Sequence, residues 1–207
     1  MVNKHAYLII AHSEPEVLKT LVSLIDDERN DIFIHIDKKV NINDFSEVRA
    51  IKSNLFFLDK RIDVHWGNLS IVEVEFLLFE TAKQNGPYKY YHILSGVDLP
   101  IHNQDYIHSF IKKIGNDKEF VSIASDSDLK NKKDILHKTD QYWFFTDNIR
   151  RNGTFKSLMS NFFASVFVNI QRILGIHRKF EIEIRKSCQF MSITDDLCDY
   201  LLQNKSN

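Results

Sequence analysis

The run Ala6-Tyr7-Leu8-Ile9-Ile10-Ala11 near the start of the chain is continuously apolar. Such a run is typical of a strand that is buried on both faces, as in parallel sheets covered by helices. Directly after it, Ser13-Glu14-Pro15-Glu16 fits a capping box with Ser13 as N-cap and Glu16 at N3. The sequence therefore predicts a strand followed at once by a helix, which is the first half of a βαβ unit.

The alternation of strands and helices continues over the first 100 residues. Strands are predicted at 31–36, 54–58 and 90–94, and a helix at 70–84 that is ended by Gly86-Pro87. This alternation predicts an α/β fold with a central, mostly parallel sheet flanked by helices. Because parallel crossovers are right-handed, the strands at 6–11, 31–36, 55–58 and 90–94 are expected to form one sheet in the order 3-2-1-4.

One domain is expected to span residues 1–207. Residues 1–100 form its nucleotide-binding half, in which ligands gather beyond the carboxyl ends of the strands. In residues 101–207 we predict a helix around 106–111, strands at 120–123 and 189–193, a solvated loop at 126–140 and a last helix that opens at Thr194.

The strongest amphipathic pattern lies between Phe155 and Leu174, where apolar residues recur at helical spacing. We expect a helix that is buried against the sheet. The alternative is a helix that contacts a membrane surface or lines an acceptor channel. The polar face of this helix lacks the Lys/Arg density of a surface-binding helix, which favours the first interpretation.

Composition excludes several classes of protein. Lys and Arg number 27 against 28 Asp and Glu, and this balance provides no positive excess for nucleic acid binding. The two cysteines, Cys188 and Cys198, have no spacing that indicates a zinc site or a disulfide framework. No run approaches the roughly 18 apolar residues of a membrane span. We expect a cytoplasmic protein, with peripheral association at the inner face of the membrane as an alternative.

Three segments after predicted strands or before a helix carry candidate binding residues. Asp37 ends the second strand, where a carboxylate can accept hydrogen bonds from a base or ribose, or simply belong to a polar turn. Trp66, at the mouth of the helix at 70–84, can stack on a base or sugar ring, or can be a core residue beside a turn glycine. The segment Ser95-Gly96-Val97-Asp98 can meet a diphosphate or a sugar, or can form an ordinary β-turn.

This last segment contains no Asp-x-Asp, so the usual carboxylate pair for a divalent metal is absent from the sequence there. No metal site is expected. Further along, Ser187 and Gln189 provide small polar groups at the start of a late strand, where they could bind sugar hydroxyls.

In this order, the segments resemble the core-2/I-branching family of glycosyltransferases, which includes branching N-acetylglucosaminyltransferases and peptide O-xylosyltransferases. The similar segments are Ala6–His12, His35-Ile36-Asp37-Lys38, Val64-His65-Trp66-Gly67 with Ser70, Leu94-Ser95-Gly96-Val97-Asp98-Leu99-Pro100-Ile101, and Gln189–Thr194. The resemblance spans essentially the whole chain.

The resemblance implies a GT-A type fold and an inverting, metal-independent transfer of a sugar, N-acetylglucosamine or xylose, from a UDP-sugar. The acceptor would be a glycan, a polysaccharide or a protein, and no cofactor would be needed. By this resemblance the donor-binding residues are His12, Asp37, Trp66, Ser95, Gly96 and Asp98, and the acceptor-binding residues are Ser187 and Gln189.

The sequence departs from the family at its end. In the family the Glu that acts as general base follows the last helix predicted here, and basic residues that hold the diphosphate come later still. The catalytic base is therefore expected beyond Asn207, and the isolated chain is expected to bind UDP weakly and transfer little sugar. The alternatives are an inactive UDP-sugar-binding remnant and an unrelated Rossmann-like binding module.

Overall fold

The computed structural model describes residues 4–65, 68–115, 117–123, 139–144, 155–180, 184–185 and 187–205. The contacts divide the chain into two compact units. The first contains residues 1–64, 69–122 and 189–207, and the second contains residues 65–68 and 123–188. The assignment of one domain to residues 1–207 stays a prediction.

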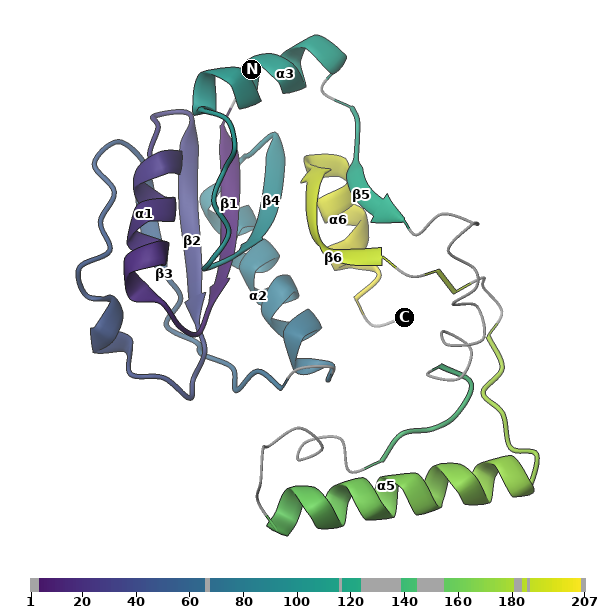
Figure 1. Cartoon of the computed structure of the whole chain (residues 1–207). Coiled ribbons are helices and arrows are strands. Elements are labelled where there is room, and N and C mark those ends of the chain that lie inside the picture. Colours follow the sequence, from purple (N-terminus) through teal and green to yellow (C-terminus); the bar gives the residue numbers. More distant parts are fainter. Residues whose placement is uncertain are drawn as a thin grey trace. The chain divides into compact units, whose positions relative to one another are not determined.

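The described residues form a sheet in the order β3-β2-β1-β4-β6-β5, with helices before and after its strands (Figure 1). β1 is parallel to β2 and β4, β2 is parallel to β3, and β4 is antiparallel to β6. The predicted order 3-2-1-4 and the predicted α/β class are confirmed, and the architecture is consistent with a GT-A-like fold. In chain order the elements are β1 (His5–Ala11), α1 (Pro15–Ile25), β2 (Asn30–Ile36), η1 (Ile42–Phe45), β3 (Asn54–Phe57), α2 (Ser70–Asn85), β4 (Tyr90–Ser95), α3 (Gln104–Ile114), β5 (Phe120–Ile123), α5 (Phe155–Ile173), β6 (Ser187–Thr194) and α6 (Asp195–Gln203).

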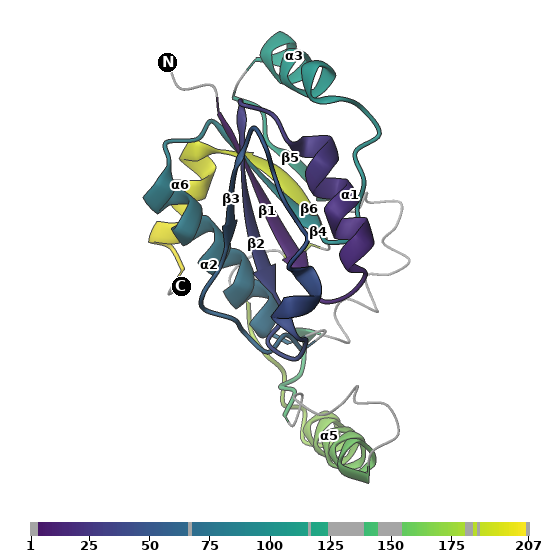
Figure 2. The same ribbon diagram turned by 90° about the vertical axis from the view of Figure 1, so that its left-hand side faces the viewer.

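Helices cover both faces of the sheet, because successive side chains of a strand point to opposite faces. Ala6, Leu8 and Ile10 of β1 belong to a core cluster with apolar residues of α2 and α6. Tyr7, Ile9 and Ala11 belong to a second cluster with apolar residues of α1. Figure 2 shows α1 on one side of the strands and α2 with α6 on the other. All residues of β1 and β2 are buried, which agrees with the unbroken apolar run in the sequence.

The predicted capping box at the start of α1 is wrong. The helix begins at Pro15, its N-cap is Glu14 in a left-handed conformation, and no side chain caps it. Proline is favoured at the first helical position because its fixed φ suits the helix and its missing N–H needs no partner there. That preference moves the N-cap one residue past Ser13. At the other end of the chain the predicted helix is confirmed: the Thr194 hydroxyl accepts a hydrogen bond from the Leu197 N–H at the start of α6.

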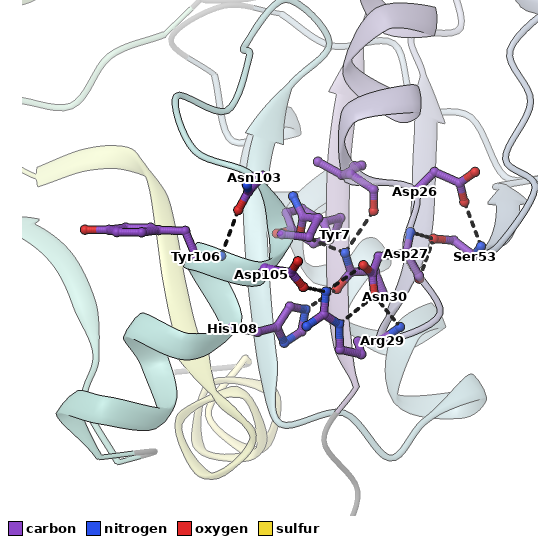
Figure 3. Close-up of polar contacts among 12 residues, drawn as sticks. Tyr7, Asp26, Asp27, Arg29, Asn30, Ser53, Asn103, Asp105, Tyr106 and His108 are labelled. Atoms are coloured by element: carbon purple, nitrogen blue, oxygen red, sulfur yellow. Dashed lines mark hydrogen bonds and ion pairs between the residues drawn. The ribbon is translucent and has the colours of Figure 1, made fainter.

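A polar network at the amino-terminal edge of the sheet holds α3 in place (Figure 3). The Gln104 side-chain oxygen accepts hydrogen bonds from the Tyr7 hydroxyl at 2.9 Å and from the Asn30 side-chain amide at 2.8 Å. Arg29 bridges Asp27 and Asp105, with 2.7 Å to each carboxylate. This edge is opposite the one at which the predicted donor residues lie, so these charges serve the fold.

In the second unit the predicted helix over 155–174 is present as α5, and its burial against the sheet stays a prediction. Most of its described apolar side chains are exposed, and only Ala164, Val168 and Gln171 are buried. The periodicity correctly indicated a helix, but spacing alone cannot show what covers its apolar side. Of the predicted solvated loop at 126–140, only residues 139 and 140 lie within the described residues.

Candidate functional site

The predicted donor residues after β1, β2 and β4 lie at one edge of the sheet. In the parallel register Ala11 is level with Ile36, and Ile10 is level with Ser95. The Asp37 N–H donates to the Ala11 carbonyl at 2.8 Å, and the Gly96 N–H donates to the Ile10 carbonyl at 2.9 Å. His12, which comes next along the chain from β1, has an exposed side chain. The structure therefore brings His12, Asp37 and the Ser95–Asp98 segment together, while their roles stay predictions.

Asp37 is buried, with an exposed fraction of 4%, and its carboxylate is already engaged by a neighbour. One of its oxygens accepts the Lys39 N–H at 2.9 Å, and the other is 3.1 Å from the Lys39 Nζ. The same Nζ is 2.8 Å from Asp63 and also donates to the Val64 carbonyl. A ribose or base that binds Asp37 would therefore meet a carboxylate held in place by an ammonium group.

Arg61 fixes the backbone around Asp37. Its guanidinium donates to the carbonyls of Ile36 at 3.0 Å, Asp37 at 2.6 Å and Val40. His35, two residues earlier, accepts the Ile62 N–H on Nε2 at 2.9 Å. Burial lowers the pKa of His35 to about 4, so the ring is neutral at pH 7. These bonds connect the end of β2 to the chain after β3. The sequence alone did not predict the role of Arg61 or that of His35.

The Ser95–Asp98 segment is a turn closed by its own side chains. The Asp98 carboxylate accepts the Ser95 N–H at 2.7 Å, and the Asp98 N–H donates to the Ser95 carbonyl at 3.3 Å. A Cβ on Gly96 would lie 2.6 Å from the Ala11 Cβ, closer than real Cβ atoms approach. Glycine is thus required because the turn passes close against β1. The Asp98 carboxylate shapes this turn, in agreement with the β-turn interpretation of the sequence.

Glu75 joins this edge from α2, and sequence analysis missed it. β6 runs antiparallel to β4, so its first residues lie near the edge where β4 ends. There the Gln189 side chain hydrogen-bonds the Glu75 carboxylate. Burial raises the pKa of Glu75 to about 7, and the bond from Gln189 only partly offsets that rise. Among the described carboxyl groups, Glu75 is the one whose pKa is raised. The sequence feature that could have pointed to Glu75 is its position as a lone charged residue within the apolar run Val74–Phe79.

Two predicted site residues are not placed with the others. Trp66 lies outside the described residues. Ser187 belongs to the second unit and is exposed, and its hydroxyl donates to the Cys188 carbonyl at 3.0 Å. Of the two predicted acceptor residues, the structure places Gln189 alone at this edge, beside Glu75, and its role stays a prediction.

A cavity of about 580 Å³ lies on the face of the sheet that carries α1 and α3, within the first unit. Its lining is mainly apolar and includes Leu94, Phe110 and Phe120, with Asp98 from the predicted donor turn. Some of the polar side chains in its lining bond one another or their neighbours: His92 bonds Ser192 at 2.7 Å and His5 at 3.0 Å. Cavities of this size and apolar character are typical of small-molecule sites. In the sequence, the feature that could have pointed to this cavity is the aromatic pair Tyr106 and Phe110, four residues apart on one side of α3.

Within the part of the chain that the structure describes, no cluster of three or more His, Cys, Asp or Glu side chains could hold a metal ion. Metal independence stays a prediction. In the same residues, no helix has both the length and the hydropathy needed to cross a bilayer.

The family model described as Core-2/I-Branching enzyme matches residues 5–206, nearly the whole chain. This match covers every segment on which the predicted resemblance rests, so that prediction is confirmed. No curated protein matches the chain.

Proposed function

Since the chain belongs to the Core-2/I-Branching enzyme family, a family of glycosyltransferases, we propose that it transfers a sugar from a UDP-sugar to a glycan or protein acceptor by an inverting, metal-independent reaction. The transferred sugar is N-acetylglucosamine or xylose. The observation that carries the donor side of this proposal is the convergence of Asp37 and Gly96 on the consecutive carbonyls of Ala11 and Ile10.

Each part of this edge supports a step of donor binding. The turn at Gly96 packs close against Ala11 of β1, which holds the Ser95–Asp98 segment at the edge where His12 and Asp37 lie. The Asp37 carboxylate, oriented by Lys39, is suited to accept hydrogen bonds from ribose hydroxyls or the base. The cation of Lys38 follows at once, and it would offset part of the negative charge of UDP.

On the acceptor side, Glu75 positions Gln189. An acidic group whose pKa is near 7 changes charge in the physiological range, and the carboxyl group of Glu75 is hydrogen-bonded to the Gln189 amide. The bond orients the Gln189 amide so that its oxygen is left to accept from a sugar hydroxyl.

Calorimetric titration of the purified chain with UDP tests the donor proposal, with manganese in one series and EDTA in the other. We expect the same affinity in both series. In Asp37→Asn the affinity should fall by roughly 10- to 100-fold, because a hydrogen bond to a charged group is lost. Asp59→Asn is the matched control, since Asp59 is exposed in the loop after β3.

Strict dependence of UDP binding on manganese would overturn metal independence. Equal UDP affinity in Asp37→Asn and Asp59→Asn would remove Asp37 from the donor site. To identify the sugar, release of UDP from UDP-N-acetylglucosamine and UDP-xylose should be compared with and without glycan acceptors.

A further inference from the structure

In the described part of the second unit, an exposed apolar surface runs along α5 and the residue after it. Its nine exposed apolar side chains include Leu158 at 67%, Phe162 at 63% and Ile173 at 84%. With about 100° of rotation per residue, all nine fall within one half of the helix circumference, with Asn169 at the margin. We call this half the α5 surface. Its members are Leu158, Met159, Phe162, Phe163, Val166, Phe167, Ile170, Ile173 and Leu174.

The opposite side of α5 is attached to the described segment 139–144. Gln171 accepts the Tyr142 N–H at 2.8 Å and donates to the Tyr142 carbonyl at 2.8 Å. The rings of Phe144 and Phe167 meet edge to face at 4.6 Å between centroids. Ala164 and Val168, on the same side as Gln171, are buried. This attachment covers the side of the helix around Gln171 and reaches the α5 surface at its edge, through Phe167. All nine members of the α5 surface, Phe167 included, keep exposed side chains.

The charges around this surface are mostly positive; among the described residues the acidic neighbour is Asp140 of the attached segment, whose carboxylate is 2.7 Å from the His177 Nδ1. From 155 to 180 the sequence contains Lys156, Arg172, Arg178 and Lys179, and no Asp or Glu. The whole chain, in contrast, has a net charge of −1. The cations gather mainly at the end of α5 and just after it, which is why the helix face alone lacked the Lys/Arg density of a surface-binding helix.

Aromatic residues stand beside these cations. The Arg178 guanidinium lies over the rings of Tyr142 at 5.5 Å and Phe180 at 4.8 Å. Tyr142 and Phe144 are themselves exposed. Amphipathic aromatic rings and long cationic side chains are the groups that occupy the boundary between lipid headgroups and acyl chains.

We propose that the α5 surface docks on an anionic lipid bilayer, with its Phe and Leu side chains in the headgroup–acyl boundary and Arg178 and Lys179 against the lipid phosphates. Hydrophobic burial supplies the attachment, and the positive charge selects anionic lipid. In this arrangement α5 lies along the membrane plane, because the side opposite the α5 surface carries the polar residues Ser165 and Gln171. This docking does not depend on the proposed donor chemistry, since it uses none of the donor residues.

Vesicle flotation of the purified full chain tests this proposal, without UDP. Vesicles of phosphatidylcholine alone are compared with vesicles of phosphatidylcholine mixed with the anionic lipid phosphatidylglycerol. We expect binding to the mixed vesicles that weakens with added salt. Phe162→Ser should weaken it by roughly tenfold or more, because a buried phenyl ring is lost. Lys179→Glu should weaken it by about tenfold on the mixed vesicles alone.

Lys112→Glu is the matched control, because Lys112 is an exposed lysine of α3 in the first unit. Circular dichroism of each variant shows whether the chain still folds. The proposal is overturned if the chain binds neither vesicle, or if Lys112→Glu weakens binding as much as Lys179→Glu. It is also overturned if sedimentation shows a dimer that Phe162→Ser dissociates while vesicles are not bound, which would assign the surface to a second copy of this chain.

Discussion

Replacing Gly96 by alanine should damage the turn that the donor proposal depends on. The added Cβ would stand 2.6 Å from the Ala11 Cβ and 3.2 Å from the Ala11 Cα. Favourable contact between carbon atoms lies at about 3.5–4.0 Å, so the first distance is short by about 1 Å. Ala11 is a buried residue of β1 whose Cβ cannot rotate away. The turn must therefore shift, and it can do so only by weakening the bond from the Gly96 N–H to the Ile10 carbonyl.

The magnitude follows from the cost of overpacking. Gly96→Ala should lower the free energy of unfolding by about 1–3 kcal/mol. Gly96 is not among the residues with positive φ, so no backbone strain adds to this cost. Ala11→Gly alone should cost about 0.5–1 kcal/mol, as glycine does inside a strand. The double variant that combines Gly96→Ala with Ala11→Gly lacks the 2.6 Å contact. Its loss of unfolding free energy should therefore be smaller than the sum of the two single losses, by about 1–2 kcal/mol.

Urea denaturation of the four proteins measures this coupling, with the midpoints compared at a constant slope. UDP titration of the same proteins should show that Ala11→Gly restores part of the affinity lost in Gly96→Ala. The reasoning is refuted if the loss in the double variant equals the sum of the two single losses within about 0.5 kcal/mol. Mutational effects add in this way when the two residues do not touch. The close approach of the turn to β1 would then not explain the glycine.

Two further predictions concern pH. Burial lowers the pKa of His92 to about 3. A histidine that stays neutral when folded contributes stability above its unfolded pKa of about 6.5, so the free energy of unfolding should fall by about 2 kcal/mol from this residue between pH 7 and pH 5. NMR titration should show the His92 ring unprotonated at pH 5; protonation of His92 above pH 5 would contradict its burial. Glu75 acts in the opposite sense, because its raised pKa makes the folded state hold a proton more tightly than the unfolded state between about pH 4.5 and pH 7. Glu75→Gln should therefore stabilise the chain relative to wild type above pH 7, by at most about 3 kcal/mol, and the gain should vanish near pH 4.5. Equal stability of Glu75→Gln and wild type above pH 7 would argue against the burial of Glu75.

The stability readouts also separate folding from function. Loss of UDP binding in a variant with an unchanged unfolding midpoint assigns the lost interaction to the ligand. Loss of both assigns it to the turn or strand that the residue supports. For Asp37 this distinction matters, since the same carboxylate holds Lys39.

Much of the first unit could be predicted because its signals are local. The unbroken apolar run at 6–11 indicates a strand buried on both faces, and β1 is buried throughout. Once the strands and helices alternate, the handedness of the crossovers leaves one order for the first four strands, and the sheet has that order. Residues that follow parallel strands must then meet at one edge, so the sequence alone suffices to place Asp37 and Gly96 near each other.

Contacts between distant segments could not be predicted in this way. The pattern at 155–174 showed a helix, but helical spacing is the same whether the apolar side is buried or exposed, and most of it is exposed. The start of α1 depended on a competition between Ser13 as a cap and Pro15 at the first helical position, which the local backbone decided.

The sequence by itself determined the fold class, the order of the first four strands and the family, because periodicity, strand handedness and ordered motifs are written along the chain. The tertiary structure alone decided that a Cβ on Gly96 would stand only 2.6 Å from the Ala11 Cβ, and that Gln189 meets Glu75 across more than a hundred residues. Burial is the physical reason. The pKa of a carboxyl group and the room for a Cβ depend on which atoms surround them in space, and that surrounding exists only once the chain has folded.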